Sequence, residues 1–373
     1  MTSYTLRRAP VVRFGEHVSD ELGKLLPASC RRVLFLTGRH ASSHAERLRG
    51  ILTESGREVL LIRGVTPEPP PDEVDRIVQS ARDFRADSAV ALGGGSVIDA
   101  AKAAAALIPA EGTCMEHFSG LREIVGEGVF FAALPTTSGT GAEMTNNSVL
   151  TDPATKIKKS LRSPFMTPSL ALVDPLLTHD APPALTAACG LDAFVQAAES
   201  YTSLKANSYT KALALTALKK IADALPKAFA DGSDAAARAL MAEGSMLTGL
   251  AFSQSGLGAV HGLAHPVGSL RHVPHGVACA ILMTTVFRFN AETVPEPYAE
   301  MARALGVGDT AEDFTEFAAR LAGGLMIPRG FSSFGLTRAD FPFIVKNCRS
   351  GSMSCNPRPV SDADAEGLLS GLL

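Results

Sequence analysis

The sequence lacks the features of several protein classes. It has no run of about 18 apolar residues, so we expect no membrane-spanning helix. Its first eight residues, Met-Thr-Ser-Tyr-Thr-Leu-Arg-Arg, lack the apolar core of a signal peptide. The net charge is only −3, and no basic cluster is longer than residues 156–159, which argues against a nucleic-acid surface. We therefore expect a cytoplasmic protein with neither a nucleic-acid nor a membrane partner.

The cysteines argue against a zinc ribbon and against a disulfide framework. The chain has six, and they are scattered without Cys-x-x-Cys pairs or the spacing of a zinc ribbon. This usage predicts reduced thiols in a cytosolic protein rather than a disulfide framework.

The first half of the chain alternates short apolar runs with helical patterns. Strands are predicted at 33–36, 59–62, 88–92, 129–134 and 170–173. Helices are predicted at 45–55, 72–84 and 99–107, and Asp72 can cap the second of them. This alternation is typical of a parallel sheet with helices on both faces, which binds ligands beyond the carboxyl ends of its strands.

The second half changes character near Pro182. Strand-like runs nearly vanish, and alanine- and leucine-rich segments predict helices at 184–203, 208–229 and 234–252. Because 373 residues exceed what one hydrophobic core usually supports, we expect two domains. They are an α/β dinucleotide-binding domain over residues 1–181 and an all-helical metal and substrate domain over residues 182–373.

Histidine is scarce but concentrated. Four of the nine histidines lie within Gly256–Gly276, namely His261, His265, His272 and His275. His261 and His265 are spaced i, i+4, which places them on one face of a helix. Imidazole is a common metal ligand and proton carrier, so the cluster is a candidate site. The spacing also fits capping or core histidines.

Two glycine-rich segments follow predicted strands. Gly93–Lys102 opens a helix with three glycines and Ser96, and helix amides there bind phosphate. It is not the Gly-x-Gly-x-x-Gly fingerprint, and a plain tight turn remains an alternative. Pro135–Thr145 is dense in hydroxyls, which suits hydrogen bonds to a ribose, a pyrophosphate or an amide, although a surface loop has the same composition.

Asp192 and Gln196 form a further i, i+4 pair in a predicted helix. A carboxylate can join imidazoles on a divalent metal, but a lone aspartate more often caps a helix or faces solvent.

Together these motifs resemble the iron-containing (group III) alcohol dehydrogenases in order and spacing. The resemblance extends to Cys355-Asn356-Pro357-Arg358, and residues 249–255 are similar to the lactaldehyde and butanol dehydrogenase branch. It implies an N-terminal dinucleotide-binding domain and a helical C-terminal domain with the active site in the cleft. The expected cytoplasmic protein is a homodimer.

The resemblance also implies roles for individual residues. Those at the pyrophosphate are Gly94, Gly95, Ser96 and Asp99. Those at the ribose, phosphate and nicotinamide are Thr136, Thr137, Thr140 and Lys158. Asp192, His261 and His275 match metal ligands, and His265 matches a histidine beside the substrate that can relay a proton.

Gln196 departs from the family pattern, because the family usually has a fourth ligand there, a histidine. Three alternatives follow. The metal, Fe²⁺ or Zn²⁺, is held more weakly by Asp192, His261 and His275, with Gln196 or water completing the set of ligands. Otherwise the site binds a different metal, or it has lost the metal. Loss would give a metal-independent reductase of an anionic oxo-acid, similar to the maleylacetate reductases. The glycine and threonine motifs keep the alcohol-dehydrogenase form, so we expect a retained metal.

The nucleotide preference depends on the turn after the first predicted strand. NAD-preferring members tend to have an acidic residue there, whereas this chain has Gly38, Arg39 and Ser42. Without a carboxylate to repel it, a 2′-phosphate can bind to Arg39 and Ser42, so we predict NADP as the cofactor. NAD is the alternative. The simpler interpretation is that Arg39 is only solvated.

The sequence therefore predicts an NAD(P)-dependent alcohol dehydrogenase or aldehyde reductase. Its expected substrate is a small alcohol or aldehyde, whose oxygen the metal polarises. Candidate substrate contacts are Asn147, Phe252 and Arg271. If Arg271 faces the cleft, it can pair with a substrate carboxylate, which would suit the oxo-acid alternative, but a solvent-facing arginine is equally consistent with the sequence. A non-redox lyase on the related dehydroquinate-synthase scaffold, or an inactive binding protein, is a further alternative.

Overall fold

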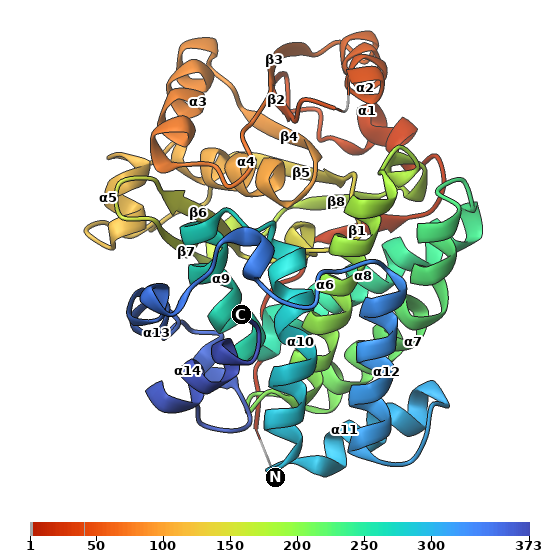
Figure 1. Ribbon diagram of the computed structural model, residues 1–373. Helices are drawn as coiled ribbons and strands as arrows, with labels where there is room; N and C mark the ends of the chain where they lie inside the picture. The colour runs from red at the N-terminus through yellow and green to blue at the C-terminus, as the bar shows by residue number, and fades with distance from the viewer. Residues whose placement is uncertain (1–2, 41) are drawn as a thin grey trace. The chain divides into compact units, whose positions relative to one another are not determined.

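The computed structural model describes residues 3–40 and 42–373, apart from the side chain of Ser42. Contacts within the chain divide it into two compact units. One unit is Arg7–Asp180, and the other is Ala181–Leu373 together with residues up to Leu6. The first contains the sheet and the second is helical, which confirms the predicted fold class (Figure 1).

The sheet unit is built on six parallel strands in the order β1-β8-β5-β4-β2-β3. The strands of this sheet are β1 (Val11–Phe14), β2 (Arg32–Thr37), β3 (Glu58–Arg63), β4 (Ser88–Gly93), β5 (Phe130–Pro135) and β8 (Leu170–Val173). The helices of the unit are α1 (Leu22–Leu25), α2 (Ser42–Glu54), α3 (Pro71–Phe84), α4 (Gly95–Leu107) and α5 (Cys114–Ser119).

Alternation along the strands produces two apolar cores, one on each face of the sheet. In β2, Leu34 and Leu36 pack with residues of α3 and α4, whereas Val33 and Phe35 pack with residues of α1 and α2. Successive side chains of a strand point to opposite faces, so a strand buried on both faces is apolar throughout.

Five of these strands confirm the prediction, and the differences have physical reasons. The edge strand β1 is largely exposed, and the antiparallel hairpin of β6 (Asn147–Asp152) and β7 (Ile157–Arg162) is rich in polar residues. Neither has the apolar run by which a buried strand is recognised.

The starts of the three helices predicted for the sheet unit also differ from the expectation, and α2 begins at Ser42, three residues before its predicted start. Helix α4 begins at Gly95, four residues before the predicted start, because Gly94 is extended and acts as the N-cap. In α3, Asp72 lies in the first turn after Pro71 instead of capping the helix, and Pro70 is the N-cap.

The helical unit contains the predicted long helices and several shorter ones. They are α6 (Pro183–Thr202), α7 (Ser208–Ala230), α8 (Ala235–Ser255), α9 (Ala259–Arg271), α10 (His275–Ala291), α11 (Pro295–Leu305), α12 (Ala311–Gly324), α13 (Phe341–Asn347) and α14 (Asp362–Ser370). Four buried aromatic rings, one each from α6, α10, α11 and α12, lie at the centre of its core, with ring centroids 5.7–5.9 Å apart in four of their pairs. They are Phe194, Phe287, Tyr298 and Phe314.

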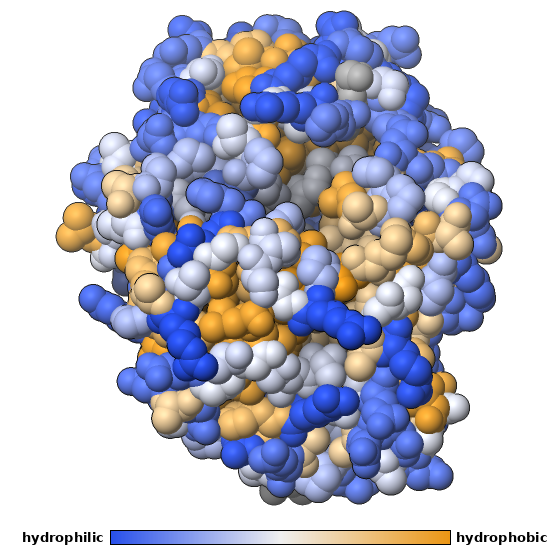
Figure 2. Space-filling model, viewed as in Figure 1, coloured by the Kyte–Doolittle hydropathy of each residue, from blue (hydrophilic) through white to orange (hydrophobic). Residues whose placement is uncertain are grey.

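Hydrophilic residues cover much of the face drawn in Figure 2, with hydrophobic residues between them. A mixed surface of this kind is ordinary for a folded protein. Among the described residues, no helix combines the length and the apolarity needed to cross a membrane.

Helices α6 and α10 approach closely where Gly276 faces the backbone of Ala188. A Cβ atom on Gly276 would overlap the carbonyl oxygen of Ala188. Backbone cannot rotate away as a flexible side chain can, so this approach requires glycine. Since His275 precedes Gly276, this contact also fixes the backbone position from which the His275 side chain extends.

We predict that Gly276→Ala lowers the free energy of unfolding by about 1–3 kcal/mol, the usual cost of overpacking. Gly367→Ala is the matched control, because a Cβ on this glycine of α14 meets nothing within 4 Å. It should be neutral or stabilise by up to about 1 kcal/mol through helix propensity. Urea denaturation followed by circular dichroism measures both, and equal stability of the two variants would contradict the packing argument.

Candidate metal centre and nucleotide-binding loops

Three helices of the helical unit each contribute an i, i+4 pair of polar side chains to one cluster. The pairs are Asp192 and Gln196 from α6, His261 and His265 from α9, and His275 and Cys279 from α10. Residues four apart lie one turn apart on the same face of a helix, so each helix presents two adjacent groups. The structure thus brings together every metal-site residue that the sequence suggested.

Four donor atoms of this cluster converge. Asp192 Oδ1 lies 3.3 Å from His261 Nε2 and 3.7 Å from His275 Nε2. Cys279 Sγ lies 3.8 Å from His275 Nε2. One donor atom from each of these four residues lies within 4.8 Å of all the others, a spacing that suits a single metal ion.

His265 stands beside this group. Its ring centroid is 5.3 Å from that of His275 and 6.4 Å from that of His261. It is half-buried, whereas His261 is fully enclosed. A half-buried imidazole next to the donor atoms can exchange a proton with a bound molecule or with solvent.

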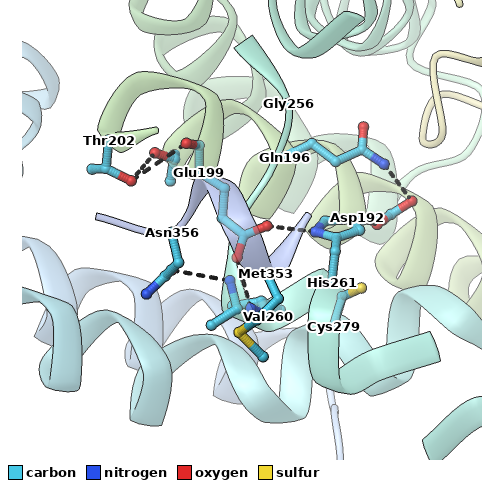
Figure 3. Close-up of polar contacts among 12 residues, drawn as sticks. Asp192, Gln196, Glu199, Thr202, Gly256, Val260, His261, Cys279, Met353 and Asn356 are labelled. Atoms are coloured by element: carbon cyan, nitrogen blue, oxygen red, sulfur yellow. Dashed lines mark hydrogen bonds and ion pairs between the residues drawn. The ribbon is translucent and has the colours of Figure 1, made fainter. Parts of the chain in front are cut away.

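A buried carboxylate, Glu199, orients His261 from the side opposite the donor atoms (Figure 3). Glu199 Oε2 lies 2.6 Å from His261 Nδ1, and Glu199 Oε1 accepts a hydrogen bond from the Val260 amide at 2.7 Å. A proton on Nδ1 leaves Nε2 with a lone pair directed at Asp192. Metal-binding histidines usually donate their second N–H in this way.

The charges of the cluster are those of a site that attracts a cation. Burial by itself lowers the pKa of His261, but interactions with Cys279, Glu199 and Asp192 outweigh it and raise that pKa well above its usual value. Burial raises the pKa of the Cys279 thiol to about 11, and His261 opposes this increase. Two enclosed carboxylates therefore hold a positive charge between them, as a proton on His261 or as a metal ion.

Gln196 contacts the cluster through its amide nitrogen (Figure 3). Gln196 Nε2 donates to Asp192 Oδ2 at 2.9 Å, the carboxylate oxygen that does not face the imidazoles. Among the described residues, nothing forms a hydrogen bond with the buried Gln196 Oε1. The donor set, with one carboxylate, two imidazoles and a thiol, fits a divalent metal, and Gln196 holds the carboxylate in place.

In the sheet unit, the predicted nucleotide loops follow the carboxyl ends of β5 and of two further strands, β2 and β4. Strands β2 and β4 are neighbours, with Thr37 opposite Leu92, although β3 comes between them in sequence. The chain reverses its direction of winding at this position, and open α/β sheets bind ligands there.

The start of α4 packs against the threonine-rich loop. A Cβ atom on Gly95 would lie 2.7 Å from Thr140 Oγ1, and one on Gly94 would lie 3.3 Å from Thr137 Oγ1. The amide of Thr136 donates to the Gly93 carbonyl. The glycines therefore allow hydroxyl groups to gather at a helix N-terminus, where amides and the helix dipole favour an anion.

A proline-rich turn adds an unexpected partner to this loop cluster. Glu68 has a left-handed backbone with φ of 54°, and its amide donates to Ser96 Oγ at 3.1 Å. Its carboxylate pairs with Lys158 Nζ at 2.6 Å. Lys158 therefore lies next to the N-terminus of α4, as a phosphate-binding lysine would.

Asp99 is buried inside the sheet unit. Its buried carboxylate lies 3.7 Å from Lys102 Nζ, and burial raises its pKa to about 6. Lys102 also donates to the carbonyls of Ala142 and Asn147. This lysine fixes the loop after β5 to the hairpin. The predicted pyrophosphate contact of Asp99 stays a prediction, and its observed contacts are structural.

The turn after β2 is only partly defined. Gly38 is half-buried, and a Cβ on it would contact Val97 at 3.5 Å. Arg39 is an exposed residue of the same turn. The side chain of Ser42 lies outside the described residues, so its predicted role stays a prediction.

The three predicted substrate residues are not brought together by contacts within either unit. In the sheet unit, Asn147 Nδ2 donates to Ser160 Oγ at 3.2 Å. In the helical unit, Phe252 is half-buried in α8, and Arg271 donates through two nitrogens to Asp340 at 2.6 and 3.1 Å. This bidentate pair gives Arg271 a structural role, which argues against its predicted role of binding a substrate carboxylate.

Sequence reasoning missed four polar residues at these sites, namely Cys279, Glu199, Glu68 and Lys102. The i, i+4 spacing of His275 and Cys279 was available as a signal. Glu199 also follows Asp192 by seven residues, two helical turns along the same face. No local pattern pairs Glu68 with Lys158, because the two are 90 residues apart.

Comparison with known proteins agrees with this arrangement. Residues 9–175 match the family model of iron-containing alcohol dehydrogenase, and residues 186–373 match the C-terminal family of Fe-containing alcohol dehydrogenases. An NAD-dependent methanol dehydrogenase of Bacillus methanolicus is 31% identical over 100% of both chains. An NADPH-dependent butanol dehydrogenase of Clostridium saccharobutylicum is 34% identical over 91% of this chain and 89% of its own.

A solved structure extends the similarity to three dimensions. The crystal structure of a 1,3-propanediol oxidoreductase superposes with a TM-score of 0.94 at 31% identity and covers 100% of both chains. The two family matches together span nearly the whole sequence. The chain therefore belongs to the iron-containing alcohol dehydrogenase family and is an oxidoreductase that acts on CH–OH groups with NAD(P).

Proposed function

We propose that the protein interconverts a small primary alcohol and its aldehyde, with NADP(H) as the preferred nucleotide and a divalent metal, Zn²⁺ or Fe²⁺, at the helical cluster. The convergence of Asp192 Oδ1, His261 Nε2 and His275 Nε2 carries the proposal. Alcohol dehydrogenases among the relatives support the substrate class.

Different residues of the helical cluster would bind the metal, orient its ligands and donate a proton. Asp192, His261 and His275 would hold the metal, and Glu199 keeps a proton on His261 Nδ1 so that Nε2 faces the metal. When bound, the metal supplies Lewis acidity to the carbonyl oxygen and the nicotinamide supplies a hydride. His265 would donate a proton to the reduced oxygen, because it is the half-buried imidazole beside the donor atoms.

The loops of the sheet unit would bind the nucleotide. The amides that begin α4 and the hydroxyls of Thr137 and Thr140 would hold its phosphates, with Lys158 as the cation. The guanidinium of the exposed residue Arg39, in a turn without a carboxylate, would bind a 2′-phosphate and so favour NADP(H) over NAD(H).

The metal-independent oxo-acid reductase is the second candidate. Gln196 and Arg271 motivate this candidate, but Arg271 is bonded to Asp340, and Cys279 is a fourth possible donor beside His275. Both observations favour the metal-dependent alternative. The expected homodimer and cytoplasmic location stay predictions.

Chelation tests the metal. We predict that dialysis against a strong chelator abolishes aldehyde-dependent NADPH oxidation, and that Zn²⁺ or Fe²⁺ restores it, because the carbonyl then regains its Lewis acid. His261→Ala should be inactive with either ion. His17→Asn alters an exposed histidine of the sheet unit and should behave as the wild type. Full activity of metal-free protein would support the oxo-acid alternative instead.

Glu199 tests how the imidazole is oriented. We predict that Glu199→Gln weakens Zn²⁺ binding by about 10- to 100-fold, the usual effect of losing an outer hydrogen-bond partner. A glutamine cannot accept from both the Val260 amide and the His261 ring. Competition with a coloured chelator measures the affinity. Glu243→Gln, which removes a carboxylate paired with Lys220, is the control, and an equal loss there would argue against the orienting role.

Arg39 tests the nucleotide preference. We predict that Arg39→Ala raises the KM for NADPH by about 10- to 100-fold, since hydrogen bonds to charged groups contribute about 1.5–3 kcal/mol. The KM for NADH should change little. Arg31→Ala is the matched control, because this exposed arginine precedes β2 at the amino edge of the sheet. An unchanged ratio of the two KM values would remove Arg39 from the binding site.

A further inference from the structure

We propose that Cys279 is a thiolate ligand of the metal, and that Gln196 is not a ligand but holds Asp192 in position. The centre would then have an Asp, His, His, Cys donor set that suits zinc. This inference rests on the proposed function, because it assumes that the helical cluster binds a divalent metal.

Three of the six separations between the donor atoms are close to those of a tetrahedral zinc site. With bonds of about 2.0–2.1 Å to nitrogen and oxygen and about 2.3 Å to sulfur, ligand atoms around zinc are about 3.4 Å apart for nitrogen and oxygen pairs and about 3.6 Å apart for sulfur and nitrogen pairs. The observed separations are 3.3 and 3.7 Å from Asp192 Oδ1 to the two imidazoles and 3.8 Å from Cys279 Sγ to His275 Nε2. Small side-chain movements would close them on one ion.

The position of Cys279 is set by helix geometry. It follows His275 by one turn of α10, so both side chains leave the same face of one helix. Cys279 is fully buried, and its sulfur lies against the His275 imidazole, with the other donor atoms within 4.8 Å. Metal binding would release the thiol proton to solvent and leave an anionic sulfur on the ion.

Gln196 is placed to orient the carboxylate. Its Nε2 donates to Asp192 Oδ2, which leaves Oδ1 directed at the imidazole nitrogens. Reversing the amide would place two oxygens against each other, so the nitrogen must face the carboxylate. A neutral amide oxygen is also a weaker ligand than a thiolate for zinc. The chain thus has a stronger fourth donor without using Gln196.

Cobalt replacement tests the inference by spectroscopy. The metal-free protein is titrated with Co²⁺, bound cobalt is counted by elemental analysis, and the near-ultraviolet spectrum is recorded. A cobalt–thiolate bond gives an intense sulfur-to-cobalt charge-transfer band, which oxygen and nitrogen ligands do not give. We expect this band in the wild type, its loss in Cys279→Ser, and its retention in Gln196→Ala with weaker binding.

Two comparisons separate the outcomes. Cys189→Ser should keep the band, because Cys189 is not among the four residues whose donor atoms converge. It is the matched control because its thiol is the half-buried one, whereas the other five are buried. Wild-type protein that binds one Co²⁺ without the band overturns the thiolate inference but leaves the proposed function intact. Protein that binds no Co²⁺ overturns both. Because the wild-type spectrum decides by itself, a Cys279→Ser variant that fails to fold does not weaken the test.

Discussion

The candidate metal centre depends on one buried carboxylate, Glu199, which joins two helices. It accepts hydrogen bonds from the Val260 amide and the His261 ring, and so ties α6 to the first turn of α9. An enclosed carboxylate is costly to bury without partners, so these two bonds specify how the helices pack. The same bonds decide which nitrogen of His261 faces Asp192. The two hydrogen bonds of Glu199 therefore determine both the packing of α6 against α9 and the geometry of the candidate metal site.

The rest of the helical unit supports that constraint. Phe194 lies between Asp192 and Gln196 in sequence but faces the aromatic core, so α6 is held from its apolar side while its polar side meets the imidazoles. Gly276 lets α10 approach α6 closely and brings His275 and Cys279 to the cluster. The aromatic contact of Phe194 and the close backbone contact at Gly276 together restrict how far the donor atoms of α6 and α10 can separate.

Under the proposed function, the sheet unit would hold the nucleotide phosphates with backbone amides and hydroxyl groups as well as with Lys158. Its loops gather around the N-terminus of α4 because glycines there permit close contact with Thr137 and Thr140. The buried Lys102 fixes the second loop from inside. Lys158 pairs with Glu68 beside the same helix start, and the side chain of this lysine is largely buried.

The sequence by itself determined the parallel sheet, the change to helices near Pro182 and the histidine cluster, since these depend on periodicity and local spacing. It did not reveal β1, a short exposed edge strand, or the β6–β7 hairpin, in which polar residues interrupt the apolar ones. Only the tertiary structure decided which atoms face one another. Gln196 replaced an expected ligand, but the helix packing showed its nitrogen on Asp192 and placed the sulfur of Cys279 beside His275. Such contacts join residues far apart in the chain, so local sequence patterns do not encode them.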